Sequence, residues 1–243
     1  MKLLIVRHAD PDYEHDTITE KGRREADFLS AELSKVPVSA FYCSPLGRAK
    51  ATASYTLQKT GRTAEECLWL REFHAPIEKP NLPGQETIPW DWLPADWTDE
   101  HSFFNKDEWY SVPCMAQKKV KEQYDWVCSE LDKTLEKHGY RRNGLLYDAV
   151  SPHNESIVFF CHFGVEAVLL SHLINISPML LWHGMAAAPS SVTTVVTEER
   201  RPGKAYFRML SFGECSHLYM NNEPRSFSAR FSECYTNEGE RLD

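Results

Sequence analysis

The feature of the sequence that most constrains its fold is a repeated pair of patterns: a short apolar run, then a stretch with helical spacing. Residues 3–6 read LLIV and stand directly before a charged residue, which is typical of a strand buried on both faces. Residues 38–43 form a second run of this kind. Strands that alternate with helices predict βαβ units, whose strands are parallel.

The rest of the chain continues this alternation, with one long interruption. Thr19 is placed to cap the first helix, in which Ala26, Leu29 and Leu33 recur at helical spacing. The other expected elements are a helix over 47–58, a short strand over 67–70, a long helix over about 120–135, a strand over 157–161, a helix over 164–174 and late strands over 192–197 and 206–210. We therefore predict an α/β fold of three layers, α/β/α, with a mostly parallel central sheet.

The interruption lies between residues 73 and about 112, where prolines and aromatic residues are concentrated. It is too aromatic for a disordered linker and too rich in proline for regular elements. Four of the seven tryptophans fall here, namely Trp90, Trp92, Trp97 and Trp109. We predict a single domain over 1–243 in which residues 73–155 form an inserted, aromatic-rich cap, whose tryptophans mostly pack its own core.

Charge and cysteine content exclude several classes of protein. The chain carries 27 basic and 35 acidic side chains, a net charge of −8, which argues against a nucleic-acid partner because phosphate backbones need basic surfaces. The seven cysteines show no zinc-ligand spacing, so no metal is expected, and scattered thiols favour a reducing, cytoplasmic location. The first apolar run is too short for a signal peptide, and no stretch is long enough to span a membrane.

Two histidines stand at the ends of predicted strands, His8 after the first run and His162 after residues 157–161. In parallel sheets, ligands bind at the carboxyl ends of the strands. Arg7 precedes His8 and Arg48 follows the second strand, so two guanidinium and two imidazole groups are expected at one sheet edge. Such a cluster is costly unless an anion neutralises it, and a phosphoryl group fits because arginine N–H groups pair with its oxygens.

Short motifs around these residues occur in a recognisable order. They are Arg7-His8-Ala9, Thr19-Glu20-Lys21-Gly22, the segment SPLGRAKATA over 44–53, Leu70-Arg71-Glu72, Cys161-His162-Phe163-Gly164 and Ser216-His217-Leu218. In this order the set resembles the histidine phosphatase superfamily, also called phosphoglycerate-mutase-like, over roughly residues 1–72 and 155–220. The insertion carries none of these motifs.

The resemblance implies catalysis without a metal or other cofactor. His8 would attack phosphorus and become a phosphohistidine, while Arg7, Arg48 and His162 would hold the phosphoryl oxygens. Glu72 would protonate the leaving oxygen and later activate water, for which burial under the insertion must raise its pKa. The expected activity is metal-independent hydrolysis of a small phosphorylated metabolite, with substrate specificity residing in the insertion. The sequence does not indicate the oligomeric state.

Four positions depart from the family pattern or extend it. Ala9 replaces the usual glycine, which is tolerated unless position 9 needs a positive φ. Phe163 replaces a common glycine beside His162 and is a candidate for substrate binding through its backbone N–H. His15 lies where the family often has an asparagine, and it is either a substrate ligand or a solvated loop residue. Thr19 is a further candidate ligand, although capping of its helix is favoured.

Three other functions remain open. A cysteine-dependent phosphatase would use Cys43, but four residues instead of five separate it from Arg48, so Cys43 is expected to be a buried strand residue. A phosphoglycerate mutase shares the same core, and hydrolysis is favoured over it because the signature around Glu72 is short. A non-catalytic module that binds a phosphorylated ligand is disfavoured because the nucleophile, the acid and both arginines are present.

Overall fold

The computed structural model describes residues 1–228, 233–234 and 237–241. Its main element is an eight-stranded sheet in the order β5-β4-β10-β1-β11-β12-β9-β8. The strands are β1 (Lys2–Arg7), β4 (Val38–Cys43), β5 (Glu65–Glu66), β8 (Tyr140–Asn143), β9 (Leu146–Ala149), β10 (Ser156–Cys161), β11 (Val192–Arg201) and β12 (Lys204–Glu214).

The strands β5, β4, β10 and β1 pair in parallel, whereas the pairs from β1 to β8 are antiparallel. Because two successive antiparallel pairings restore the direction, β12 and β8 run with β1, and only β11 and β9 run against it. The predicted α/β fold with a mostly parallel sheet is therefore confirmed. The purely parallel half of the sheet carries both histidine motifs.

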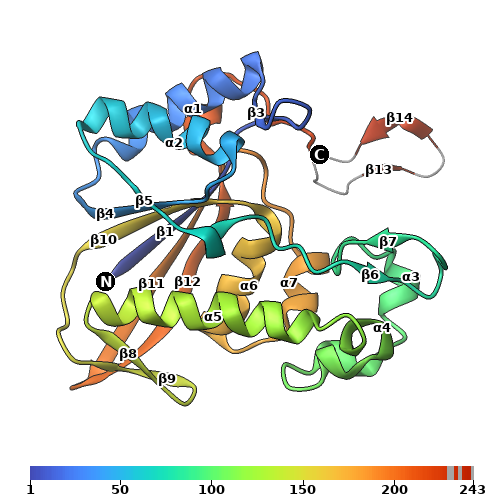
Figure 1. The fold of residues 1–243 in the computed structure, drawn as a ribbon. Coiled ribbons are helices and arrows are strands. Elements are labelled where there is room, and N and C mark those ends of the chain that lie inside the picture. The colour runs from blue at the N-terminus through green and yellow to red at the C-terminus, as the bar shows by residue number, and fades with distance from the viewer. Residues whose placement is uncertain (229–232, 235–236, 242–243) are drawn as a thin grey trace.

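Helices cover both faces of the sheet (Figure 1). One layer consists of α1 (Glu20–Leu33) and α2 (Gly47–Thr60), and the other of α5 (Val120–Lys137), α6 (Phe163–Ile174) and α7 (Pro178–Gly184). In β1, Leu3 and Ile5 belong to the core on the α5 and α6 side, while Leu4 and Val6 belong to the core on the other side. Successive side chains of a strand point to opposite faces, which explains why this run is apolar throughout.

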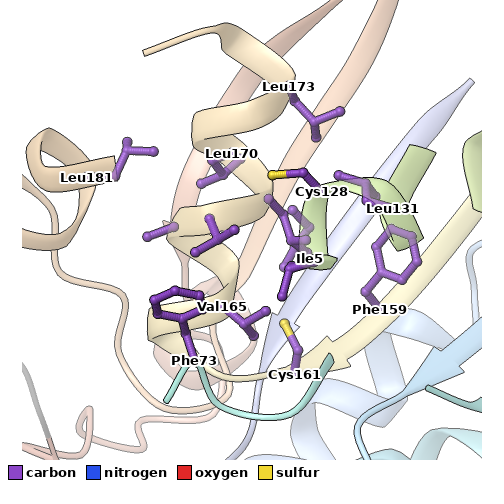
Figure 2. Packing of buried hydrophobic residues seen from close by; sticks show 14 of the residues in the cluster. Ile5, Phe73, Cys128, Leu131, Phe159, Cys161, Val165, Leu170, Leu173 and Leu181 are labelled. Atoms are coloured by element: carbon purple, nitrogen blue, oxygen red, sulfur yellow. The ribbon is translucent and has the colours of Figure 1, made fainter. Parts of the chain in front are cut away.

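The larger core lies between the sheet and the helices α5 and α6 (Figure 2). It includes Ile5 and Phe159 from the sheet, Leu131 from α5 and Val165 and Leu170 from α6. All five side chains are fully buried. Burying such a side chain stabilises the fold by about 1.5–3 kcal/mol. This packing fixes the start of α6, and with it His162, against the end of the sheet.

The prediction of a strand over residues 67–70 is wrong. The third parallel strand is β5, two residues earlier, and residues Leu68–Leu70 form a turn of 3₁₀ helix, η1. Cys67 still donates to the Cys43 carbonyl (2.8 Å), after which Leu70 N–H donates to the Cys67 carbonyl (3.0 Å) and closes the turn. The turn buries the consecutive residues Trp69 and Leu70 together, which a strand would point to opposite faces.

The interruption contains only short elements. They are β6 (Ile77–Glu78), β7 (Glu86–Thr87), α3 (Pro94–Trp97), α4 (Pro113–Ala116) and the 3₁₀ turns η2 (His101–Phe104) and η3 (Trp109–Ser111). These elements lie beyond one end of the sheet in Figure 1. The later part of residues 73–155 is different, because α5 belongs to a helix layer and the β8–β9 hairpin extends the sheet beside β12.

The tryptophans of the interruption are buried, as an aromatic core requires: Trp90, Trp92, Trp97 and Trp109. Trp109 contacts Trp182 of α7 edge to face, with ring centroids 5.8 Å apart. Residues 73–119 are therefore packed onto the helix that follows α6.

Five small elements complete the description, namely β2 (Pro11–Asp12), β3 (Thr17–Ile18), α8 (Ser216–Tyr219) and the pair β13 (Glu233–Cys234) with β14 (Asn237–Arg241). None of the helices within the described ranges is both long and apolar enough to cross a membrane.

Candidate active site

The parallel strands bring the two histidine motifs side by side. Arg7, the last residue of β1, is in register with Cys161, the last residue of β10, so His8 and His162 follow the strands at the same level. Their ring centroids are 5.1 Å apart. Both imidazoles are buried. The predicted juxtaposition at the carboxyl edge of the sheet is present.

His8 is held by main-chain hydrogen bonds on three sides. Its N–H donates to the Cys161 carbonyl (3.0 Å), and its carbonyl accepts from Ser190 N–H (3.0 Å). The ring nitrogen Nδ1 lies 2.8 Å from the Ala9 carbonyl. A carbonyl only accepts, so Nδ1 carries the proton and Nε2 keeps its lone pair.

The surroundings of His8 keep its ring neutral. Burial lowers its pKa well below the usual value, and the positive charges of Arg7 and Arg48 act in the same direction. An unprotonated imidazole with Nε2 as the available nitrogen is the form in which histidine acts as a nucleophile.

His162 has one satisfied and one unsatisfied ring nitrogen. Its Nε2 lies 2.8 Å from Ser44 Oγ, which also accepts from Leu46 N–H (3.2 Å). The Ser44 hydroxyl hydrogen has no other acceptor among the described residues, so we assign it to Nε2, which places the proton of His162 on Nδ1. This buried Nδ1 has no hydrogen-bond partner among the described residues. The site thus contains a buried donor that lacks an acceptor.

Arg7 is almost completely buried and makes contacts with main-chain carbonyls. Its guanidinium donates to the Ala187 carbonyl and to the Ser228 carbonyl (3.0 Å). Its central carbon lies 5.9 Å from the centroid of the Phe163 ring. Burial lowers its pKa, an effect that the nearby carboxyl groups of Glu72 and Glu166 oppose.

Arg48, on the first turn of α2, is paired with a residue that the sequence did not single out as a site residue. Its Nη1 donates to Asp16 Oδ1 (2.8 Å), and Gly47 N–H donates to Asp16 Oδ2 (2.7 Å). A Cβ on Gly47 would collide with the Asp16 carbonyl, so glycine is required there. The Nε of Arg48 is buried without a partner in the described chain. The sequence did offer one signal for Asp16: it stands next to His15, in the loop where the family often has an asparagine.

Glu72 reaches the same site from the loop after η1. Its Oε1 accepts from Phe73 N–H (2.8 Å) and from Val165 N–H (3.1 Å). A Cβ on Gly164 would come within 2.7 Å of Glu72 Oε1 and 2.8 Å of Trp90 Nε1, so the carboxylate, the indole and α6 meet where only glycine fits. Burial raises the pKa of Glu72, while the two N–H donors and Arg7 oppose this rise.

The other residues that the sequence singled out are Thr19, His15, Phe163 and Ala9, and the structure shows the contacts or the backbone conformation of each. Thr19 caps α1, because its hydroxyl accepts from Gly22 N–H (3.0 Å), and it also donates to Asp10 (2.6 Å). His15 is exposed and pairs with Asp12 at 2.9 Å. Phe163 is buried against Trp90, with ring centroids 5.9 Å apart. Ala9 is not among the residues of positive φ in the described chain, so the condition for tolerating alanine there is met.

Three further residues stand behind the site, two of them in the quoted motifs, and the sequence indicated no individual role for any of them. Thr52 of α2 accepts from Ala9 N–H (2.9 Å) and ties the first motif to the second. His217, in the late motif, lies 2.9 Å from the hydroxyl of Ser190, the residue whose N–H holds His8. Glu166, one turn after His162, is fully buried beside Thr193, and burial raises its pKa to about 7, which the hydrogen bond with the Thr193 side chain opposes.

Comparisons with known proteins agree on the fold. The family model of the histidine phosphatase superfamily (branch 1) matches residues 3–208. No curated protein matches the sequence closely enough to count as a relative.

Similar solved structures include a phosphoserine phosphatase mutant from Entamoeba histolytica in complex with phosphoserine, at 17% identity and a TM-score of 0.57, covering 89% of this chain and 98% of the other. A mycobacterial glucosyl-3-phosphoglycerate phosphatase is similar at 15% identity and a TM-score of 0.55, covering 87% and 98%. At these identities the likeness concerns the fold.

Proposed function

The chain belongs to the histidine phosphatase superfamily, and from this premise we propose that it hydrolyses a small phosphomonoester through a phosphohistidine on His8. One observation carries the proposal. Two buried donors, His162 Nδ1 and Arg48 Nε, lack acceptors in the described chain at the edge where His8 offers a free Nε2 lone pair. A phosphoryl group supplies both the missing acceptors and the electrophile.

In the first step, His8 Nε2 forms a bond to phosphorus as the ester P–O bond breaks. The bonding electron pair leaves with the ester oxygen, which takes a proton from Glu72. In the second step, water attacks phosphorus and gives a proton to Glu72, the N–P bond breaks, and inorganic phosphate leaves. The raised pKa of Glu72 suits a group that must carry the proton first.

The charge that the phosphoryl group brings would be met by Arg7, Arg48 and His162. Electrostatic stabilisation by such fixed donors dominates phosphoryl transfer. The Asp16 carboxylate already occupies one side of Arg48, so an incoming phosphoryl group would use the unsatisfied Nε side.

The proposed substrate is a small phosphorylated metabolite. Trp90 of the insertion lies beside Glu72, so the insertion reaches the place where the ester's leaving group would sit. The solved structure similar to this chain that was determined with phosphoserine favours a compact ester.

The test is a panel of phosphorylated metabolites, assayed for phosphate release in the presence of a metal chelator, with His8→Ala as the blank. We expect turnover in the wild-type chain and acid-labile phosphate trapped on it, and loss of both in the variant. Equal turnover by His8→Ala, or turnover that disappears with the chelator, contradicts the proposal.

The same panel separates the two rival functions. Conversion of 3-phosphoglycerate to the 2-isomer, without net phosphate release, would instead indicate a mutase. Binding of phosphorylated ligands with no turnover in the wild-type chain would indicate a binding module.

A further inference from the structure

A second group of chemically active side chains lies away from the proposed catalytic edge, the end of the sheet where Arg7, His8, Arg48, Glu72 and His162 meet. One ligand atom from each of His138, His153 and Glu155 lies within 4.8 Å of the others. His138 ends α5, and the other two belong to the loop that leads into β10. Glu155 and His162 lie at opposite ends of β10, so roughly 20 Å of strand separates this group from His162, which lies beside the proposed nucleophile His8.

The tautomer of His153 is fixed by its surroundings. Its Nε2 lies 2.8 Å from the His138 carbonyl, which only accepts, so Nε2 carries the proton and Nδ1 presents a lone pair. A ring N–H held by a main-chain carbonyl is the usual support of a histidine that ligates a metal through its other nitrogen. Here that other nitrogen lies 4.0 Å from Glu155 Oε2.

His138 is oriented in a similar way. Its Nε2 lies 2.9 Å from the hydroxyl of Tyr42, and its ring stands edge to face with the tyrosine ring at 5.9 Å. His153 packs edge to face on Tyr140 at 5.6 Å. Both imidazoles are half-buried against aromatic rings, whereas Glu155 is exposed, which leaves one side of the group open to solvent.

We propose that His138, His153 and Glu155 form a binding site for a divalent transition-metal ion of the zinc type, distinct from the catalytic edge. Two imidazoles and a carboxylate are donors that zinc accepts, with water as the fourth ligand. To bind the ion, the three ligand atoms must approach one another to within about 3.5 Å. This is the separation between ligand atoms in a tetrahedral site with Zn–N and Zn–O bonds of about 2 Å. The exposed Glu155 side chain is free to make most of that movement.

Metal binding has one identifiable cost. His153 Nδ1 accepts from Glu155 N–H at 3.2 Å, and the metal would take this lone pair. This hydrogen bond is at the long end of the normal range, so little is lost. The neighbouring positive charge of Lys137 is offset by Glu65, whose carboxylate lies 3.4 Å from its ammonium group.

A bound ion would join three parts of the fold. His153 accepts at its carbonyl from the N-terminal ammonium (2.8 Å), Lys2 N–H donates to the Glu155 carbonyl (2.9 Å), and His138 closes α5. Because the unfolded chain does not bring these groups together, metal binding stabilises the folded state. The expectation of no structural metal rested on spacing along the chain, which does not register two histidines 15 residues apart that a helix end and a loop bring together.

The test is a titration of the chelator-treated, full-length chain with Co²⁺ and Zn²⁺. We expect one equivalent of Co²⁺ with the visible absorption of imidazole and carboxylate ligation, displaced by Zn²⁺, and a rise in the thermal midpoint on adding Zn²⁺. Glu155→Gln and His153→Gln should lose that equivalent and the rise. Tyr42→Phe should weaken binding by about ten-fold.

The control is His172→Gln. It removes another histidine near a carboxylate, since His172 Nε2 lies 2.9 Å from Asp132, but one with a single carboxylate partner. This variant should bind Co²⁺ like the wild type. The proposal is overturned if the wild-type chain binds no Co²⁺, if Glu155→Gln and His153→Gln bind it unchanged, if His172→Gln loses it equally, or if the spectrum shows thiolate ligation by one of the cysteines.

Discussion

The catalytic edge and the inserted segment 73–119 are both buried, but they are buried for different reasons. At the edge, the buried groups are imidazole, guanidinium and carboxyl side chains, and some of the donors lack acceptors among the residues that the structure describes. In the insertion, most of the large buried side chains are aromatic rings that contact one another, such as Trp92 and Phe103 with centroids 5.4 Å apart. The buried ammonium group of Lys79 has acceptors there, the main-chain carbonyls of Trp90 and Asp91. Under the proposed function, one region gives up stability to hold charge ready for a ligand, and the other supplies stability.

The sharpest test of this contrast replaces the proposed acid at the edge. Glu72→Gln should reduce kcat about 10²–10⁴-fold for an alkyl phosphate and much less for p-nitrophenyl phosphate, whose leaving group needs no proton. Since Glu72 must start protonated, kcat/KM should fall as pH rises through its raised pKa, and the variant should lack this limb. Glu78→Gln, exposed in the insertion, is the control. An equal loss for both esters would contradict the acid role.

The opposite test removes a ring from the insertion. Trp109 is 1% exposed, so Trp109→Ala should lower the free energy of unfolding by about 3–5 kcal/mol in a urea titration. Turnover of p-nitrophenyl phosphate by the folded variant should stay near that of the wild type. Leu93→Ala, at an exposed position of the same segment, should change stability by less than about 0.5 kcal/mol. A large fall in turnover with little loss of stability would erase the distinction.

A third test concerns the cost of holding charge at the edge. The pKa of Glu166 is raised from 4.5 to about 7, so the folded chain binds the proton more tightly than the unfolded chain. Stability should then fall as pH rises from about 4.5 to 7, by about 3 kcal/mol from this group. Glu166→Gln should remove that fall, seen as urea midpoints from pH 5 to 8. Glu122→Gln, at an exposed position of α5, should follow the wild type, and a Glu166→Gln curve parallel to the wild-type curve would refute the claim.

The smallest expected effect concerns the Asp16 carboxylate, which already pairs with Arg48 at the edge. Asp16→Asn keeps an acceptor for Gly47 N–H but removes the charge beside Arg48. Inhibition by inorganic phosphate or vanadate should strengthen by up to about five-fold, the range of a partly exposed ion pair. Asp27→Asn, which removes an equal charge on α1, should leave inhibition unchanged. Weaker inhibition of Asp16→Asn would show that the carboxylate helps to position Arg48 more than it competes.

The sequence predicted the strands that carry the site better than the turns and loops around them. The strands that end at Arg7 and Cys161 are buried on both faces, so their apolar runs marked them, and the topology rule for parallel sheets placed His8 beside His162. The prediction of a strand over 67–70 failed because a short apolar run is compatible with either a strand or a buried turn. The Asp16–Arg48 pair depends on a loop with positive φ at Asp16, which no periodic pattern indicates. The histidines at 138 and 153 meet only because α5 ends where it does.

The way in which Arg7 is held has a consequence for anyone who surveys this protein by mutation. Its guanidinium is anchored by the main-chain carbonyls of Ala187 and Ser228. Every amino acid carries that carbonyl, so replacing either side chain leaves the anchor in place. A complete substitution scan would report packing defects at Ala187, which is fully buried, and loss of the Ser228 hydroxyl, which lies 3.2 Å from Asp10 Oδ1, but it would not single out the two carbonyls that orient Arg7. Only changes that redirect the backbone, such as a deletion or a cut in the chain near residue 228, would reveal them.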